Sequence, residues 1–275
     1  MKTILQKLIG FIVNITGLFF PKLAARMALF LFTKPLKGKP NEKQSDFLET
    51  AFIEELKFNN MPIMTYRWLG EKQTILLVHG WESNSARWQV LITNLKKKGY
   101  GVVALDAPAH GRSGSNRFNA IMYSEFIKVV SDRFQPSIII GHSVGGMASA
   151  LFQHTYKKEH IQKMIFLGAP SEFSDVIKRY TDMMSYSKRV SKKIDLVIKD
   201  RFGKLPEAYS TANFLEHNTS QGLIIHDKTD RIIPYNDALL IKTKYKNSTL
   251  ITTEGFGHSL ATDEVSNYIY DFIDN

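Results

Sequence analysis

The pattern of hydrophobic and polar positions changes near residue 74. Before that point, Phe52–Phe58 and Pro62–Trp68 predict two antiparallel strands joined by a turn at Asn59 and Asn60. Thr74–Val78 is then a short, continuously apolar run, as expected for a strand buried on both faces of a parallel sheet. Similar runs alternate from here with segments of helical spacing. They predict strands at 101–107, 137–143, 163–170, 222–227 and 248–254, and helices at 85–98, 119–134, 145–157, 235–246 and 262–273.

This alternation predicts an α/β fold with a mostly parallel, eight-stranded sheet and helices on both faces. The connection over residues 171–215 is too long for a plain link between strands. Its apolar positions indicate short helices with one apolar side, and they are Tyr180, Met183, Met184, Tyr186, Val190, Ile194, Leu196 and Val197. We therefore expect a small helical insertion over this segment.

The first 33 residues are unusually apolar. The run from Leu8 to Phe20 ends at Pro21, and a second run covers residues 23–32. Neither run reaches the ~20 apolar residues that span a bilayer, so a single transmembrane helix is not expected. We expect one or two helices over residues 1–33, which either lie in a membrane interface or pack on the protein itself.

Residues 34–45 contain two prolines, a glycine and many polar side chains, a composition typical of a linker. We therefore expect an N-terminal segment with its linker over residues 1–45. The remaining residues, 46–275, are expected to form one domain that includes the insertion.

Composition limits the classes of protein to which the chain can belong. A chain of 275 residues that is 44% hydrophobic can bury one large core. The absence of cysteine excludes disulfides, thiolate catalysis and cysteine-ligated metals. No metal-binding or nucleotide-binding motif stands out, so no cofactor is expected.

The net charge of +10 is unevenly distributed. Residues 1–43 hold eight Lys and Arg against one acidic residue, so most of the excess lies in the apolar N-terminal segment. That placement favours an anionic membrane surface over nucleic acid, which would need a basic face on the domain. We expect a cytoplasmic protein with no nucleic-acid partner, and peripheral contact of residues 1–33 with the inner membrane surface is one of the two expectations for that segment. A generally lysine-rich composition is the alternative explanation of the charge.

One motif carries candidate chemistry. Gly141-His142-Ser143-Val144-Gly145 has the G-x-S-x-G pattern and lies between an apolar strand and a helix. In a sharp strand-to-helix turn, side chains at the glycine positions would collide with neighbouring backbone. The turn would hold the Ser143 hydroxyl above the sheet edge, so Ser143 is the candidate nucleophile.

A serine hydroxyl needs a base within hydrogen-bond reach, and the base needs a carboxylate to orient it. In this type of site the acid and then the histidine follow the serine along the chain, each after a later strand. His258 and Asp230 have these positions. Asp227 also follows the strand, but we expect it to make hydrogen bonds within the turn.

The developing oxyanion needs hydrogen-bond donors. The backbone amide of Val144 is one candidate, and an amide in the loop after the strand at 74–78 is the other. We expect that second donor to be the amide of Trp81, which follows Gly80. The indole of Trp81 could equally pack in the protein or form a wall of the acyl pocket.

Five segments together resemble the bacterial α/β-hydrolase superfamily, in its serine esterase-like and lipase-like branch. The similarity covers about residues 50–275, and the segments are LLVHGW (76–81), ALDAPAHGRSG (104–114), GHSVGG (141–146), HDKTDRIIP (226–234) and GFGHSL (255–260). The resemblance implies the α/β-hydrolase fold. It further implies a lid at the insertion over residues 171–215 and a structural role for Asp106 at the top edge of the sheet.

The resemblance implies a serine hydrolase that acts on a carboxylic ester or a related acyl bond of a small molecule. A thioesterase, peptidase, perhydrolase or C–C hydrolase could use the same three residues. A non-catalytic binding protein on this fold is a further alternative, because a fold does not dictate a function.

Overall fold

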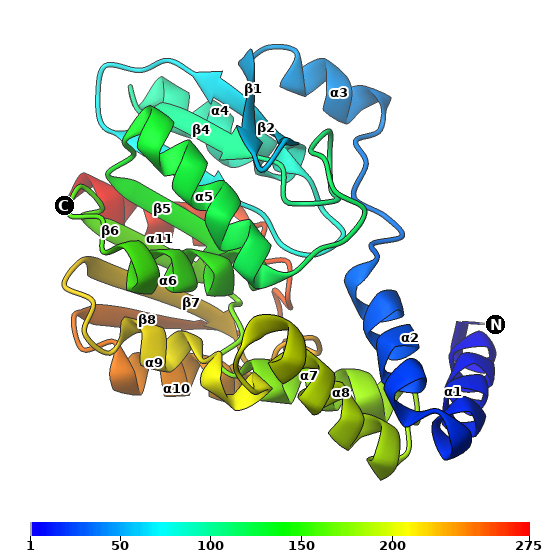
Figure 1. The fold of residues 1–275 in the computed structure, drawn as a ribbon. Coiled ribbons are helices and arrows are strands. Elements are labelled where there is room, and N and C mark those ends of the chain that lie inside the picture. Colours follow the sequence, from blue (N-terminus) through cyan, green and yellow to red (C-terminus); the bar gives the residue numbers. More distant parts are fainter. Residues whose placement is uncertain (1) are drawn as a thin grey trace. The chain divides into compact units, whose positions relative to one another are not determined.

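The computed structural model describes residues 2–275, with side chains from Ile4 onward, so Met1 of the predicted N-terminal segment lies outside the described residues (Figure 1). The chain forms two compact units. Unit 1 comprises Met1–Lys34 and Glu172–Ser210, and unit 2 comprises Pro35–Ser171 and Thr211–Asn275. The predicted insertion and the predicted N-terminal segment thus fall largely within the same unit.

Unit 2 contains an eight-stranded sheet with the strand order β1-β2-β4-β3-β5-β6-β7-β8. The strands are β1 Phe52–Phe58, β2 Met61–Trp68, β3 Thr74–Val78, β4 Gly101–Leu105, β5 Ile138–His142, β6 Lys163–Leu167, β7 Gln221–Asp227 and β8 Ser248–Thr253. β1 and β2 pair antiparallel with each other, β2 pairs antiparallel with β4, and the other pairs are parallel. The predicted mostly parallel sheet is confirmed.

Helices cover both faces of this sheet (Figure 1). One face packs against α5 Ala120–Phe134, α6 Val144–Tyr156, α9 Thr211–Leu215 and α10 Tyr235–Lys244. The other packs against α3 Glu42–Leu48, the short 3-10 helix η1 Ser85–Trp88, α4 Gln89–Lys97 and α11 Asp263–Asp274. Alternate residues of a strand point to opposite faces of the sheet and so belong to different cores. In β3, Leu76 and Val78 are buried in the core on the α5 side, and Ile75 and Leu77 in the core on the α4 side.

Three local details differ from the sequence prediction. The last residues of the predicted linker begin α3, because Asn41 and Gln44 cap its first turn reciprocally. The predicted helix at 85–98 divides at Trp88 into η1 and α4. The five-residue helix α9 was not predicted, because it is too short to show a helical period.

Unit 1 is helical and has a core of its own. It contains α1 Lys2–Phe19, α2 Pro21–Thr33, α7 Phe173–Met183, α8 Lys188–Phe202 and the 3-10 turn η2 Pro206–Ala208. Small residues of α2 and branched residues of α8 meet in this core, among them Ala24, Ala28, Val190 and Ile194. Two segments far apart in the sequence therefore build one apolar cluster. No helix within residues 2–275 is long and apolar enough to cross a membrane.

Asp106, just after β4, braces the loops at one end of the unit 2 sheet. Its side chain is fully buried. One carboxylate oxygen accepts hydrogen bonds from the amide and hydroxyl of Ser85 at 2.9 and 2.8 Å. The other accepts from the Tyr66 hydroxyl at 2.9 Å and the Arg112 amide at 2.8 Å. The structure thus shows a bracing role for Asp106, as the sequence resemblance implied.

Replacing this carboxylate should destabilise the fold. Asp106→Ala would leave four donors without their acceptor, three of them on the fully buried Ser85 and Tyr66, and we expect the free energy of unfolding to fall by about 3 kcal/mol or more. Urea denaturation followed by tryptophan fluorescence measures this change. Asp46→Ala, on an exposed position of α3, is the control and should leave the urea midpoint nearly unchanged. Equal midpoints for the two variants would contradict the bracing role.

Candidate active site

Ser143 lies in a sharp turn between β5, which ends at His142, and α6, which begins at Val144. Its backbone has φ 54° and ψ −129°, a conformation that side-chain-bearing residues rarely adopt. The Ser143 amide donates a 2.8 Å hydrogen bond to the carbonyl oxygen of Leu167, the last residue of β6. This bond fixes the strained residue to the neighbouring strand.

The flanking glycines permit this turn. A Cβ atom on Gly141 would lie 2.6 Å from the Cα atom of Gly146, and one on Gly145 would lie 2.5 Å from the carbonyl oxygen of His79. Real Cβ atoms do not approach backbone so closely, so neither position could hold a larger residue without moving the chain. The glycine spacing noted in the sequence is therefore a steric requirement of the observed turn.

The structure brings His258 to Ser143. His258 lies in the loop after β8, where Gly255 and Gly257 have positive φ angles of 93° and 61°. Its Nε2 atom lies 3.0 Å from the Ser143 hydroxyl oxygen. Its Nδ1 atom lies 2.7 Å from a carboxylate oxygen of Asp230. The imidazole thus bridges the hydroxyl and the carboxylate, so Nδ1–H donates to Asp230 and Nε2 is free to accept from Ser143.

Asp230 lies in the loop after β7, and its side chain is fully buried. The oxygen that faces away from His258 accepts hydrogen bonds from the amides of Ile232 and Ile233 at 2.8 and 3.0 Å. Burial by itself would raise the pKa of this carboxyl group. Hydrogen bonds from two imidazoles and these two amides outweigh burial and hold the pKa of Asp230 well below its usual value. Asp230 is therefore an anion at neutral pH.

Asp227 is the competing candidate for the acid, and both of its carboxylate oxygens accept hydrogen bonds from residues other than His258. One oxygen accepts from the amide and hydroxyl of Thr229 at 2.9 and 2.6 Å. The other accepts from the Thr253 hydroxyl at 2.8 Å and the Phe256 amide at 2.9 Å. Asp227 thus makes the turn hydrogen bonds predicted for it, and it also joins the loop of Asp230 to the loop of His258.

The two candidate oxyanion donors flank Ser143 in different ways. Val144 is the first residue of α6, where backbone amides have no partner within the helix. Trp81 follows Gly80, and a Cβ atom on Gly80 would lie only 2.9 Å from the Cβ atom of Ser143. The loop of Trp81 therefore passes directly beside the serine. The Trp81 ring packs edge-on against His110 and is 36% exposed.

Sequence reasoning missed two histidines that support the site. His142 directs its Nε2 atom to the carbonyl oxygen of His258 at 2.8 Å, and burial lowers its pKa well below the usual value. His226 lies at the end of β7, and its Nε2 atom is 2.9 Å from the carbonyl oxygen of Ile233 and 3.4 Å from Asp230. Each is a polar residue near the end of an apolar strand, and that position was the available signal.

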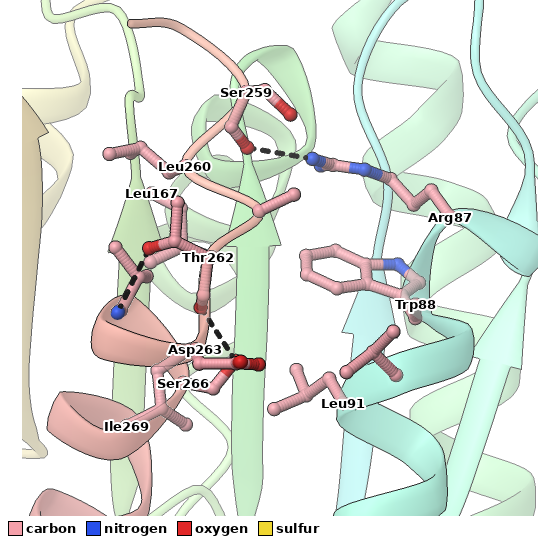
Figure 2. A pocket seen from close by; sticks show the side chains of 13 residues that line it. Arg87, Trp88, Leu91, Leu167, Ser259, Leu260, Thr262, Asp263, Ser266 and Ile269 are labelled. Carbon is pink, nitrogen blue, oxygen red and sulfur yellow. Dashed lines mark hydrogen bonds between the residues drawn. The ribbon is translucent and has the colours of Figure 1, made fainter. Parts of the chain in front are cut away.

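A pocket lies next to the His258 loop, between the start of α4 and the start of α11. Figure 2 shows Arg87 and Trp88 on one side of it, facing Ser259, Leu260 and Ile269. Arg87 spans the pocket and donates a 3.1 Å hydrogen bond to the carbonyl oxygen of Ser259. Ser143 does not line this pocket, so the hydrogen-bonded residues mark the candidate site better than the pocket does. Residues 2–275 contain no cluster of three His, Asp or Glu side chains arranged for a metal ion.

Comparison with known proteins shows the family of the chain. A family model described as the alpha/beta hydrolase fold matches residues 73–220, more than half of the chain. The uncharacterized hydrolase YugF of Bacillus subtilis is 24% identical over 247 residues, covering 74% of this chain and 90% of that protein. The bifunctional esterase/perhydrolase DCH of Acinetobacter calcoaceticus is 28% identical over 99 residues, covering 34% of this chain and 36% of that protein.

Solved structures give the same fold at low sequence identity. Est1E of Butyrivibrio proteoclasticus, solved with ferulic acid bound, aligns with a TM-score of 0.65 and 16% identity, covering 81% of this chain and all of that one. A thioesterase domain from the curacin biosynthetic pathway aligns with a TM-score of 0.60 and 18% identity, covering 81% and 99% of the two chains. At these identities the likeness concerns the fold alone.

The buried carboxylate of Asp227 should make the free energy of unfolding depend on pH in the acidic range. Burial opposes its ionised form, but its four hydrogen bonds prevail and hold the pKa of Asp227 below the usual value. A group with a lowered pKa in the folded state stabilises the protein above its unfolded-state pKa, and this contribution is lost as the pH falls. Wild type should therefore lose about 1.4 kcal/mol per pH unit from this group below about pH 4.

Asp227→Asn tests this dependence, because it removes the titrating group and keeps the shape. The variant should be less stable than wild type at neutral pH, and the difference should shrink as the pH falls below about 4. Urea midpoints measured from pH 7 down to acid would show it. Parallel curves over the whole range would contradict the assignment.

Proposed function

The chain belongs to the α/β-hydrolase family, and on that premise we propose that it is a serine hydrolase of carboxylic esters or related acyl bonds. The observation that carries the proposal is the pair of hydrogen bonds that connects Ser143 to Asp230 through His258. A buried carboxylate, an imidazole held by it and a hydroxyl on a strained turn are the groups that nucleophilic catalysis by serine needs.

The proposed reaction has two halves. The Ser143 oxygen attacks the acyl carbon, while His258 Nε2 accepts the hydroxyl proton and then gives it to the leaving group. Asp230 stays ionised, keeps the proton of His258 on Nδ1 and stabilises the imidazolium that forms. Water then attacks the acyl-enzyme by the same route, which releases the acid and restores the Ser143 hydroxyl.

The oxyanion of each tetrahedral intermediate needs donors that are in place before the reaction. We assign the backbone amides of Val144 and Trp81 to this role. Val144 supports the assignment as the first residue of α6, because the N-terminus of a helix favours negative charge. The contact of Gly80 with Ser143 supports it for Trp81.

The proposed substrate class is a small molecule with an apolar, medium-sized acyl group. The predicted lid over residues 171–215 motivates this size and polarity, since lids exclude water and shape acyl pockets. Similar proteins include the esterase EaEST of Exiguobacterium antarcticum, a thioesterase domain and a bifunctional esterase/perhydrolase. Ester cleavage is therefore the reaction to test first, with thioesters as the second series.

The nucleophile is tested by Ser143→Ala. p-Nitrophenyl esters of increasing acyl length should give turnover and an initial burst with wild type, and a fluorophosphonate should label it. In Ser143→Ala the labelling should vanish and kcat/KM should fall by at least about 10⁴-fold. An inert wild type, or turnover that survives the substitution, would overturn the proposal.

The choice of acid is tested by comparing Asp230→Asn with Asp227→Asn. Asp230→Asn should lower kcat by about 10³-fold to 10⁴-fold, because an amide no longer selects the correct tautomer of His258. Asp227→Asn should change kcat by less than about tenfold, since Asp227 does not contact His258 and acts only through the loop. Thermal melts establish that both variants are folded. Equal losses of kcat would show that the assignment of the acid is wrong.

A further inference from the structure

Helix α1 is held against the insertion by one face. Gly10 and Gly17 lie on this face, and a Cβ atom on Gly10 would collide with the carbonyl oxygen of Met184. A Cβ atom on Gly17 would lie 2.6 Å from a methyl carbon of Val190. The absence of side chains at these glycines therefore permits a close approach of the helices within unit 1.

Polar contacts fix the rotation of α1 about its axis. The Asn14 side chain donates a 2.9 Å hydrogen bond to the carbonyl oxygen of Ser185 and accepts one of 2.8 Å from the amide of Ser187. Val13, on the same side, is buried in the core of unit 1. The inner face of α1 is thereby defined, and its opposite face points away from the unit.

That outer face is apolar along the length of the helix. Ile4, Leu8, Phe11, Ile15 and Leu18 follow one another at alternating spacings of four and three, which places them on one side of a helix. Their exposed fractions run from 45% to 72%. Soluble proteins rarely leave so large a continuous apolar surface in water. This outer face, defined by these five residues, needs a covering partner.

The width of the apolar surface bears on what that partner is. Leu5, Ile12 and Phe19 form a second exposed row at spacings of seven beside the first. Two rows together are wider than the narrow seam by which two helices pair in a coiled coil. A broad apolar face on one side of a helix is instead suited to a bilayer interface.

The charge of unit 1 points to the same partner. Unit 1 holds 14 Lys and Arg against six Asp and Glu, which gives +8 of the total +10 and leaves +2 on unit 2. Lys7 is an exposed cation of α1, and Lys22 at the start of α2 is also exposed, although it lies 3.4 Å from Asp200. Two copies meeting through α1 would bring like charges together, whereas an anionic bilayer would attract them.

We propose that α1 docks by its outer face into the interface of an anionic phospholipid bilayer. The helix lies along the surface, because its inner face is bonded to the insertion and no described helix has the length and hydropathy to span. Docking therefore engages unit 1 as a whole. The insertion leaves and re-enters unit 2 at Ser171 and Thr211, where the Thr211 amide donates a 2.7 Å hydrogen bond to the Ser171 carbonyl. Unit 2 is therefore joined to the docked unit 1 at three points of the chain, which are the two ends of the insertion and the link that follows α2.

Vesicle flotation of the full chain tests the docking. Wild type should float with phosphatidylcholine vesicles that contain about one third phosphatidylglycerol, should float poorly with pure phosphatidylcholine, and should be released by high salt. The double substitution Phe11→Glu with Ile15→Glu should lower the bound fraction at least about tenfold. The matched control, Leu69→Glu with Val90→Glu, adds the same charge at unit 2 side chains that are 57% and 59% exposed, and it should float like wild type.

Each alternative gives a distinct result. Equal flotation of the two double variants, or equal binding to neutral and anionic vesicles, would overturn the proposal. A wild type that does not float but is a dimer by light scattering, and becomes a monomer with Phe11→Glu and Ile15→Glu, would show that a second copy covers the face. Ser143→Ala should float like wild type, so docking and catalysis can fail independently.

Discussion

The backbone of Ser143 is held in a conformation that costs free energy, and the arrangement of the site depends on what holds it there. The hydrogen bond from its amide to Leu167 and the close packing at Gly141 and Gly145 confine the turn between β5 and α6 to this one residue. Because β5 and β6 are parallel neighbours in the sheet, relaxing the turn would require both strand ends to move. The sheet thus maintains the strain and keeps the hydroxyl at the edge where the loops after β7 and β8 converge.

Three buried carboxylates lie at that edge of the sheet, and most of the hydrogen bonds that they accept come from loop residues. Asp106 gathers the loops after β3 and β4, Asp227 joins the loop after β7 to the one after β8, and Asp230 receives two amides of its own loop as well as His258. A buried anion with this many fixed donors can be satisfied by only one loop conformation. The same interactions that stabilise these loops therefore orient His258, which links stability to the proposed chemistry.

The two units differ in how much apolar surface they expose and in their net charge. Unit 2 buries its apolar strands between two helical layers and is nearly balanced in charge. Unit 1 buries one side of its helices, leaves the outer face of α1 apolar and carries most of the positive charge. Helix α1 uses glycines and Asn14 for its inner contacts and exposes large apolar side chains on its outer face, and the proposed membrane docking rests on this division.

The sequence by itself determined the strands and the longer helices of unit 2, because buried strands and amphipathic helices have different hydrophobic periods. It also predicted that Ser143, Asp230 and His258 would meet, since parallel strands bring their carboxyl ends to one edge. The tertiary structure decided what depends on contacts between distant residues. It separated Asp230 from Asp227 by their hydrogen-bond partners, and it gave His142 and His226 supporting positions. It also joined residues 1–34 to the insertion in one core, because the pairing of two helical segments depends on which small and large residues face each other, and a hydrophobic period alone does not record this.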